Sequence, residues 1–144
     1  MNSLDRNQKS EGIYSLLQQL PIMRGASVAR IREVAGHLRL NFRKALPGEA
    51  IVAAGSQAEA LVCTLSGSAE IQRGGKTTAF EGPQMLFPEA LFGLDTRFPQ
   101  TVTATTEVSI LEIPKDDFRK MLAMDSVFLY NYLNAVCTRA QRAR

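Results

Sequence analysis

Residues 61–76 read LVCTLSGSAEIQRGGK, and this stretch indicates antiparallel β-structure. Apolar positions recur at every second residue, as in a strand that buries one face. Those positions are Leu61, Cys63, Leu65, Ala69 and Ile71. Arg73-Gly74-Gly75-Lys76 predicts a two-residue hairpin, because paired positive φ angles cost glycine nothing. Since Cys63 falls on the apolar face, we expect it to act as a small buried hydrophobe and not as a reactive thiol.

Short runs of the same kind continue from about residue 42 to residue 113. Each run ends at a glycine or proline signal. The signals are Pro47-Gly48, Gly55-Ser56, Gly67, Gly74-Gly75 and Gly82-Pro83. The longest predicted strand covers residues 101–113, with Val102, Ala104, Val108 and Ile110 on one face. Many short strands with frequent turns predict an antiparallel sandwich or barrel.

Helices are expected on both sides of this region. Apolar residues at helical spacing follow Ile13 until Pro21, and Ser27 is a good N-cap for a second helix over residues 28–38. Pro114 suits the start of a short helix, and Asp125 or Ser126 caps a final one. We therefore predict one α+β domain over residues 1–144: helices in 1–40, a mainly β jelly roll in 41–113, and helices in 114–144.

Composition excludes several classes of protein. The chain has 144 residues, 45% hydrophobic and 22% charged, without an apolar run near the ~18 residues of a membrane span. His37 is the single histidine, so a zinc or iron site built on two or three imidazoles is not available. No G-x-S-x-G surrounds any serine, and we expect no catalytic residues, no metal and no enzyme activity. Cys63 and Cys137 lack metal-like spacing, which favours a reducing, cytoplasmic location.

The basic residues do not by themselves indicate nucleic acid. The net charge is only +3. Arginines 24, 30, 32 and 39 are interpreted as the solvated face of the second helix. The arginines at 139, 142 and 144 are interpreted as favourable cations at a helix C-terminus.

The last helix has more apolar residues than one buried stripe needs. One stripe comprises Leu129, Leu133, Val136 and Ala140, and Val127, Phe128, Tyr130 and Tyr132 widen it. A terminal helix that is apolar on two sides usually buries the second side against a partner. We expect a homodimer through residues 126–144, with this stripe as the interface. The alternative, that both sides pack on the helix's own sandwich, stays open.

The order of motifs resembles the sensor domain of the CRP/FNR superfamily, the cyclic-nucleotide-binding jelly roll. Leu20-Pro21-Ile22-Met23 and the helix after Ser27 are similar to its opening helices, and residues 44–51 with Gly55 to its first turn and strand. Phe87-Pro88-Glu89-Ala90-Leu91-Phe92, followed by residues 101–104, resembles its ligand cassette. Residues 113–118 resemble its hinge into the last helices. The match extends over nearly the whole chain and implies that fold.

The resemblance also implies a ligand site. In the family, cassette amides bind a cyclic phosphate, a glutamate binds the ribose and an arginine pairs with the phosphate. The implied ligand-binding residues here are Pro88, Glu89, Ala90, Leu91, Arg97, Gln100 and Thr101. Two departures make cyclic AMP a poorer candidate. Pro88 lacks an amide donor, and Phe98 stands in the arginine's place, with Arg97 one residue away and facing the opposite side.

Several alternatives therefore stay open. The effector is unknown: a cyclic nucleotide or haem is compatible with the family, and neither is favoured. Large apolar residues near the cassette either line an apolar pocket or belong to the core; these are Met85, Leu86, Leu91, Phe92, Leu94 and Phe98. We expect the effector-sensing domain of a bacterial transcription regulator, which would bind DNA only through a downstream helix-turn-helix. The alternative is a stand-alone module that regulates a partner protein.

Overall fold

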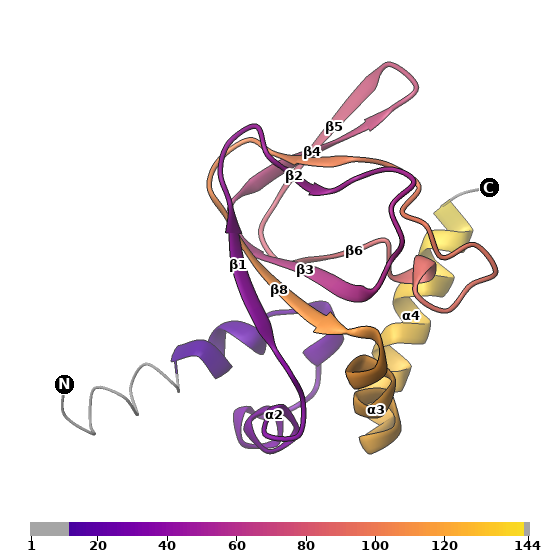
Figure 1. Cartoon of the computed structure of the whole chain (residues 1–144). Coiled ribbons are helices and arrows are strands. Elements are labelled where there is room, and N and C mark those ends of the chain that lie inside the picture. The colour runs from indigo at the N-terminus through magenta and orange to yellow at the C-terminus, as the bar shows by residue number, and fades with distance from the viewer. Residues whose placement is uncertain (1–11, 143–144) are drawn as a thin grey trace.

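Strands make up the centre of the protein and form two antiparallel sheets (Figure 1). The computed structural model describes residues 12–142. The first sheet has the order β1 (Asn41–Ala45), β8 (Val108–Pro114), β3 (Ala60–Ser66), β6 (Gln84–Leu86). The second has the order β2 (Ala50–Val52), β7 (Val102–Ala104), β4 (Ser68–Arg73), β5 (Lys76–Glu81). This strand order is that of a jelly roll, which confirms the predicted fold class.

The hairpin predicted at Gly74-Gly75 connects β4 to β5. Arg73 pairs with Lys76, and the two glycines have φ angles of 48° and 85°. Positive φ at both central residues is the turn whose twist matches that of the flanking strands. Local turn chemistry therefore determines the register of this hairpin.

The single long strand predicted over residues 101–113 is wrong. The chain forms β7 and β8 instead, and these lie in different sheets. Between them, the amides of Thr105 and Thr106 donate to the carbonyl of Ser68, at 2.9 and 3.3 Å. Ala104 and Val108 on either side of the crossing are both 1% exposed. Because both sheets bury one face in the same core, the alternation of apolar residues continues across the break and does not reveal it.

The core fills the space between the sheets and beneath the helices. β3 is buried from Leu61 to Leu65, on both of its faces. Its buried threonine, Thr64, donates to the Gly82 carbonyl at 2.9 Å. Cys63 is fully buried, and this burial raises the pKa of its thiol to about 12. It therefore acts as the small hydrophobe that was expected.

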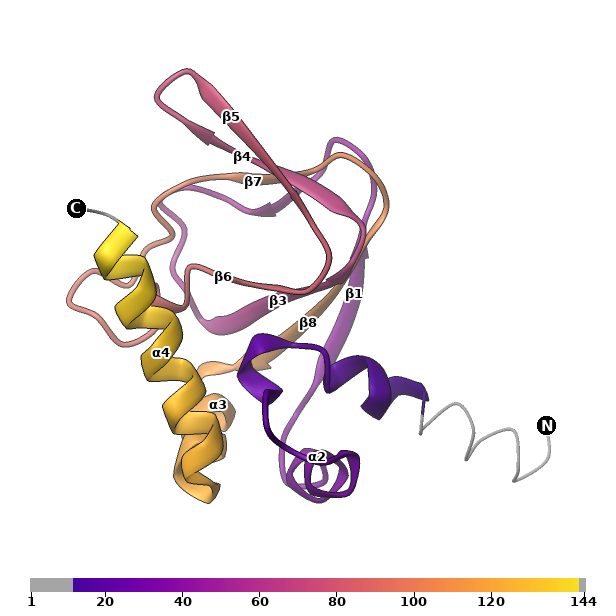
Figure 2. The same ribbon diagram turned by 180° about the vertical axis from the view of Figure 1, so that it is seen from behind.

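The helices lie on one side and at one end of the roll (Figures 1 and 2). Residues 12–17 are helical, followed by the 3-10 helix η1 (Pro21–Met23) and by α2 (Val28–Ala35). After the strands come α3 (Lys115–Met124) and α4 (Ser126–Arg142). Residues 1–11 and 143–144, which belong to the predicted ranges 1–40 and 114–144, lie outside the described residues. No helix in the described part has the length and apolarity that a membrane crossing requires.

The helix caps match the expected residues. The Ser27 side chain accepts from the Arg30 amide at 3.1 Å. Asp125 Oδ1 accepts from the Val127 amide at 2.9 Å. Both bonds satisfy amides that have no partner within their own helix. The second of them starts α4 directly after α3.

Gly67 is the turn on which the crossing between the sheets depends. Its φ is +100°, and a Cβ there would lie 2.9 Å from Val108 Cα, next to the Glu107 carbonyl. We predict that Gly67→Ala lowers the free energy of unfolding by about 3 kcal/mol, from backbone strain plus this clash. Gly48→Ala is the matched control, since Gly48 has φ +90° and open space around it. The Gly48→Ala substitution should lower the free energy of unfolding by about 1–2 kcal/mol, from backbone strain alone. Equal losses in urea titrations of the two variants would contradict the close approach.

Candidate functional site

A short segment after β6 presents the candidate ligand residues. Phe87 has φ 47°, in the left-handed region that is uncommon for a bulky residue, and its side chain is 2% exposed. Pro88–Ala90 then form the 3-10 helix η2. The Tyr132 hydroxyl of α4 donates to the Pro88 carbonyl at 2.8 Å. Burial, and then the charge of Glu89, raise the pKa of Tyr132. The segment is therefore attached to α4.

An ion pair also joins the segment to α4. Arg139 Nε donates to Glu89 Oε2 at 2.7 Å, with both side chains about two-thirds buried. The guanidinium carbon of Arg139 also lies 5.0 Å from the centre of the Phe87 ring. Glu89 Oε1 is shielded from solvent and has no hydrogen-bond partner among the described residues. Glu89 thus keeps one acceptor directed at Arg139 and a second one unused.

A cavity of about 360 Å³ opens beside this ion pair, and we call it the cassette cavity. Its walls come from the β4–β5 hairpin, the η2 segment, the loop before β7 and the end of α4. The lining residues are Ile71, Arg73, Thr78, Phe87, Glu89, Pro99, Gln100, Arg139 and Arg142. Arg73 Nε donates to Gln100 Oε1 at 3.1 Å. The cavity therefore combines an apolar base with three guanidinium groups and one carboxylate.

A second cavity, the rim cavity, also has Glu89 in its wall. It has a volume of about 430 Å³ and is lined by Gly55, Glu89, Ala90, Asp95, Arg97, Phe98 and Pro99. The Arg97 guanidinium donates twice to Asp95, at 3.0 and 3.1 Å, and it lowers the pKa of that carboxyl. Phe98 is 7% exposed and packs against Phe87 at a centroid distance of 6.5 Å. Arg97 is thus committed to its neighbour, while Phe98 belongs to the core.

The structure separates the remaining ligand candidates. Gln100 joins Glu89 in the cassette cavity, and Ala90 joins Arg97 in the rim cavity. Leu91 is 1% exposed and lines neither cavity. Thr101 is engaged elsewhere, since its hydroxyl accepts from the Ala54 amide at 3.0 Å. Glu89 is the one candidate that lines both cavities.

The apolar residues near the cassette do not make a lined apolar pocket. Met85, Leu86, Leu91 and Phe98 are buried in the core, whereas Phe92 and Leu94 are exposed. The cassette cavity offers no His, Cys, Met or Tyr side chain among its lining residues, so those residues do not fit haem ligation. His37 is exposed, and its carbonyl accepts from Lys120. Within residues 12–142, no group of acidic, His or Cys side chains is placed to hold a metal.

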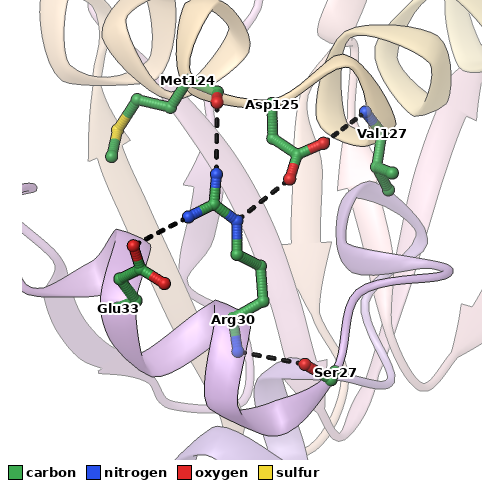
Figure 3. Close-up of polar contacts among 6 residues, drawn as sticks. All are labelled: Ser27, Arg30, Glu33, Met124, Asp125 and Val127. Carbon is green, nitrogen blue, oxygen red and sulfur yellow. Dashed lines mark hydrogen bonds and ion pairs between the residues drawn. The ribbon is translucent and has the colours of Figure 1, made fainter.

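The base of α4 is fixed by Arg30, against the expectation that this arginine is merely solvated. Figure 3 shows its guanidinium between two helical segments. It donates to Asp125 Oδ2 at 3.0 Å and to the Met124 carbonyl at 3.2 Å, and it pairs with Glu33 at 3.0 Å. The Val127 amide and then Arg30 lower the pKa of Asp125. Arg30 therefore links α2 to the junction between α3 and α4.

Arg73, Tyr132 and Arg139 belong to the candidate site and were not predicted from the sequence. Arg139 does lie in the last turn of α4, as expected, and its ion pair with Glu89 is a further role that was not predicted. The spacing of Phe128, Tyr132 and Arg139 on one side of the last helix was the available signal, because it places the arginine on the buried face. For Arg73, only the hairpin signal was present in the sequence.

Comparison with known protein families identifies the family of this chain. The model of the cyclic nucleotide-binding domain matches residues 42–125, more than half of the chain. The chain belongs to the cyclic nucleotide-binding domain family. A comparison with curated protein sequences finds no match.

Solved structures share the fold of this cyclic nucleotide-binding domain. The catabolite activator protein of Thermus thermophilus aligns with a TM-score of 0.72 at 15% identity, covering 85% of this chain. The chain spans 59% of that protein. The sensor domain of the transcriptional regulator DNR from Pseudomonas aeruginosa has a TM-score of 0.70 at 16% identity, with 88% and 91% of the two chains covered. A transcriptional regulator from Thermotoga maritima aligns with a TM-score of 0.65 at 22% identity, and the alignment covers 78% of this chain and 91% of that one. The resemblance to CRP/FNR-type sensor domains is confirmed at the level of fold.

The attachment of η2 to α4 in this cyclic nucleotide-binding domain can be tested at Tyr132. We predict that Tyr132→Phe lowers the free energy of unfolding by about 1–3 kcal/mol, because the buried Pro88 carbonyl loses its partner. Tyr130→Phe is the matched control, since Tyr130 is 68% exposed and should change stability little. Both can be measured by urea unfolding. If both variants were as stable as the parent, the bond to Pro88 would contribute nothing to holding α4.

Proposed function

We propose that this chain is the effector-sensing domain of a bacterial CRP/FNR-type transcription regulator, and that its effector is not cyclic AMP. The observation that carries the proposal is the Glu89–Arg139 ion pair. It places the cassette glutamate and the end of α4 in direct contact at the wall of the cassette cavity. A ligand that enters this cavity must compete for the same two side chains.

The case against cyclic AMP rests on the phosphate contacts. Pro88 offers no amide hydrogen, Phe98 occupies the arginine's place as a core residue, and Arg97 is paired with Asp95. A charge-assisted contact of this kind contributes about 1.5–3 kcal/mol, or one to two decades of affinity. Arg73 and Arg142 still give the cassette cavity a positive character. A small anion other than cyclic AMP is the effector class that these residues favour.

Sensing follows from the competition at Arg139. A ligand bound in the cassette cavity releases Arg139 from Glu89, or replaces Glu89 as its partner, and so changes how firmly α4 is held. A ligand shifts an equilibrium only through its different affinity for two states. The two states here are α4 bound to η2 and α4 released from it.

The effector proposal is tested by titrating cyclic AMP in a calorimeter. We predict a dissociation constant no tighter than about 1 µM. The double variant Pro88→Gly/Phe98→Arg supplies both missing groups and should bind at least about tenfold more tightly. If the double variant does not fold because arginine is buried at position 98, the single variant Pro88→Gly replaces it in the titration, and circular dichroism checks that this variant is folded. A submicromolar constant for the parent chain would overturn the proposal.

We also propose a homodimer formed through the outer face of α4. Leu129 is 42% and Leu133 51% exposed, and Ala140, about two turns after Leu133, is also exposed. Val136, between them, is half-buried against the core. The inner face is already used by Phe128 and Tyr132, so the outer stripe remains available for a second copy.

Sedimentation measures this dimer directly. Leu133→Asp should convert a dimer at tens of micromolar into a monomer, because it buries an unpaired charge in the interface. Leu94→Asp makes the same chemical change at a fully exposed residue outside α4 and should leave the dimer intact. A parent chain that sediments as a monomer contradicts the dimer.

The regulator role itself depends on a DNA-reading element. The proposal places the domain in the cytoplasm, in a protein that binds DNA only if a helix-turn-helix follows residue 144. Sequencing the gene downstream of this segment tests it. A helix-turn-helix coding region supports the regulator, and a stop codon supports a stand-alone module that regulates a partner protein.

A further inference from the structure

A third cavity lies on the opposite flank of α4 from the proposed dimer stripe. We call it the η1–α4 groove, and its volume is about 450 Å³. It is bounded by η1, β6, the start of η2 and one face of α4. The lining residues are Pro21, Arg24, Gln84, Met85, Pro88, Tyr130, Asn131, Asn134, Ala135, Thr138, Arg139 and Arg142. It shares only Arg139 and Arg142 with the cassette cavity.

The charge in this groove is of one sign. Three arginines line it, and no aspartate or glutamate does. Arg139 is partly neutralised by Glu89. The side chains of Arg24 and Arg142 form no hydrogen bond or ion pair with any other residue in the range 12–142. Two uncompensated guanidinium groups that face one cavity favour a ligand with several negative oxygens, and guanidinium binds phosphate through two parallel bonds.

The groove has a fixed wall and neutral polar groups. Asn131 Nδ2 donates to the carbonyls of Ile22 and Arg24, at 2.9 and 2.8 Å, which attaches η1 and the Arg24 backbone to α4. Asn134, Thr138 and Gln84 contribute amide and hydroxyl groups that no residue in the described part engages. Tyr130 adds an aromatic ring that is 68% exposed. Such a ring is a platform on which a base can stack.

The groove stays open in the proposed dimer. Asn131, Asn134 and Thr138 recur at i, i+3 and i+7 and so share one face of α4. Leu129, Leu133 and Ala140 lie on a different face, because successive helical residues are rotated by about 100°. A ligand in the groove would therefore touch η1 and α4 together without displacing the second copy.

We propose that the η1–α4 groove is a second binding site, for a nucleotide that carries at least two phosphate groups. Arg24 and Arg142 bind the phosphates, and the base lies against Tyr130. The volume is within the range of small-molecule sites and is larger than a single phosphate requires. The site adjoins the cassette cavity at Arg139 and Arg142, whereas Arg24, Tyr130 and Asn134 line only the groove of these two cavities, and its existence does not depend on which effector the cassette cavity binds.

Calorimetry with ADP and pyrophosphate tests the site at low ionic strength. We expect ADP to bind with a dissociation constant below about 100 µM and at least about tenfold more tightly than pyrophosphate. Arg24→Gln and Asn134→Asp should each weaken ADP at least about tenfold, the second by placing a like charge beside the phosphates. Arg119→Gln and Asn41→Asp change charge equally at exposed positions outside the groove and should alter binding less than about twofold.

Four outcomes would overturn the proposal. They are no binding of ADP, equal affinity for ADP and pyrophosphate, equal weakening by the two control variants, and a loss caused by Arg73→Gln as large as that caused by Arg24→Gln. The last would place ADP in the cassette cavity. If the parent chain binds cyclic AMP tightly while ADP still depends on Arg24, the effector proposal fails and the groove stands.

Discussion

The ion pair between Glu89 and Arg139 connects the short η2 segment to the terminal helix α4. Glu89 belongs to a short turn at the end of the roll, and Arg139 lies some fifty residues later in the terminal helix. The pair is only partly exposed, so solvent screens it less than it would an exposed pair. The hydrogen bond from Tyr132 to Pro88 supports the same contact. These two contacts hold η2 against the last half of α4 and so form one wall of the cassette cavity.

Much of the fold could be predicted from the sequence, because local signals determine its turns and caps. The two glycines before Lys76 determine a hairpin, and Ser27 and Asp125 cap the helices that follow them. The break between β7 and β8 was not predictable by the same logic. Its two flanking strands bury their side chains in one shared core, so the hydrophobic period does not change where the chain changes sheet.

The site was less predictable than the fold, for a related reason. The position of Glu89 in its motif made it a candidate. Its partner, Arg139, depends on how α4 packs against η2, and no local sequence pattern predicts that packing. Arg97 is the opposite case, because its partner is local. Its guanidinium donates two hydrogen bonds to the carboxylate of Asp95, two residues earlier in the chain. An arginine in an exposed loop pairs with whichever acid is adjacent, whereas Arg139 depends on the tertiary structure.

The contacts of Arg30 join an early helix, α2, to the junction between the last two helices, α3 and α4. Because its guanidinium bridges α2 and the α3–α4 junction, that junction cannot move relative to α2 without losing two polar contacts, those with Asp125 and Met124. The contacts of Arg30 with Asp125 and Met124 therefore oppose movement at the N-terminal end of α4. The terminal helix is therefore held at both ends, at its start by Arg30 and near its last turn by the ion pair with Glu89.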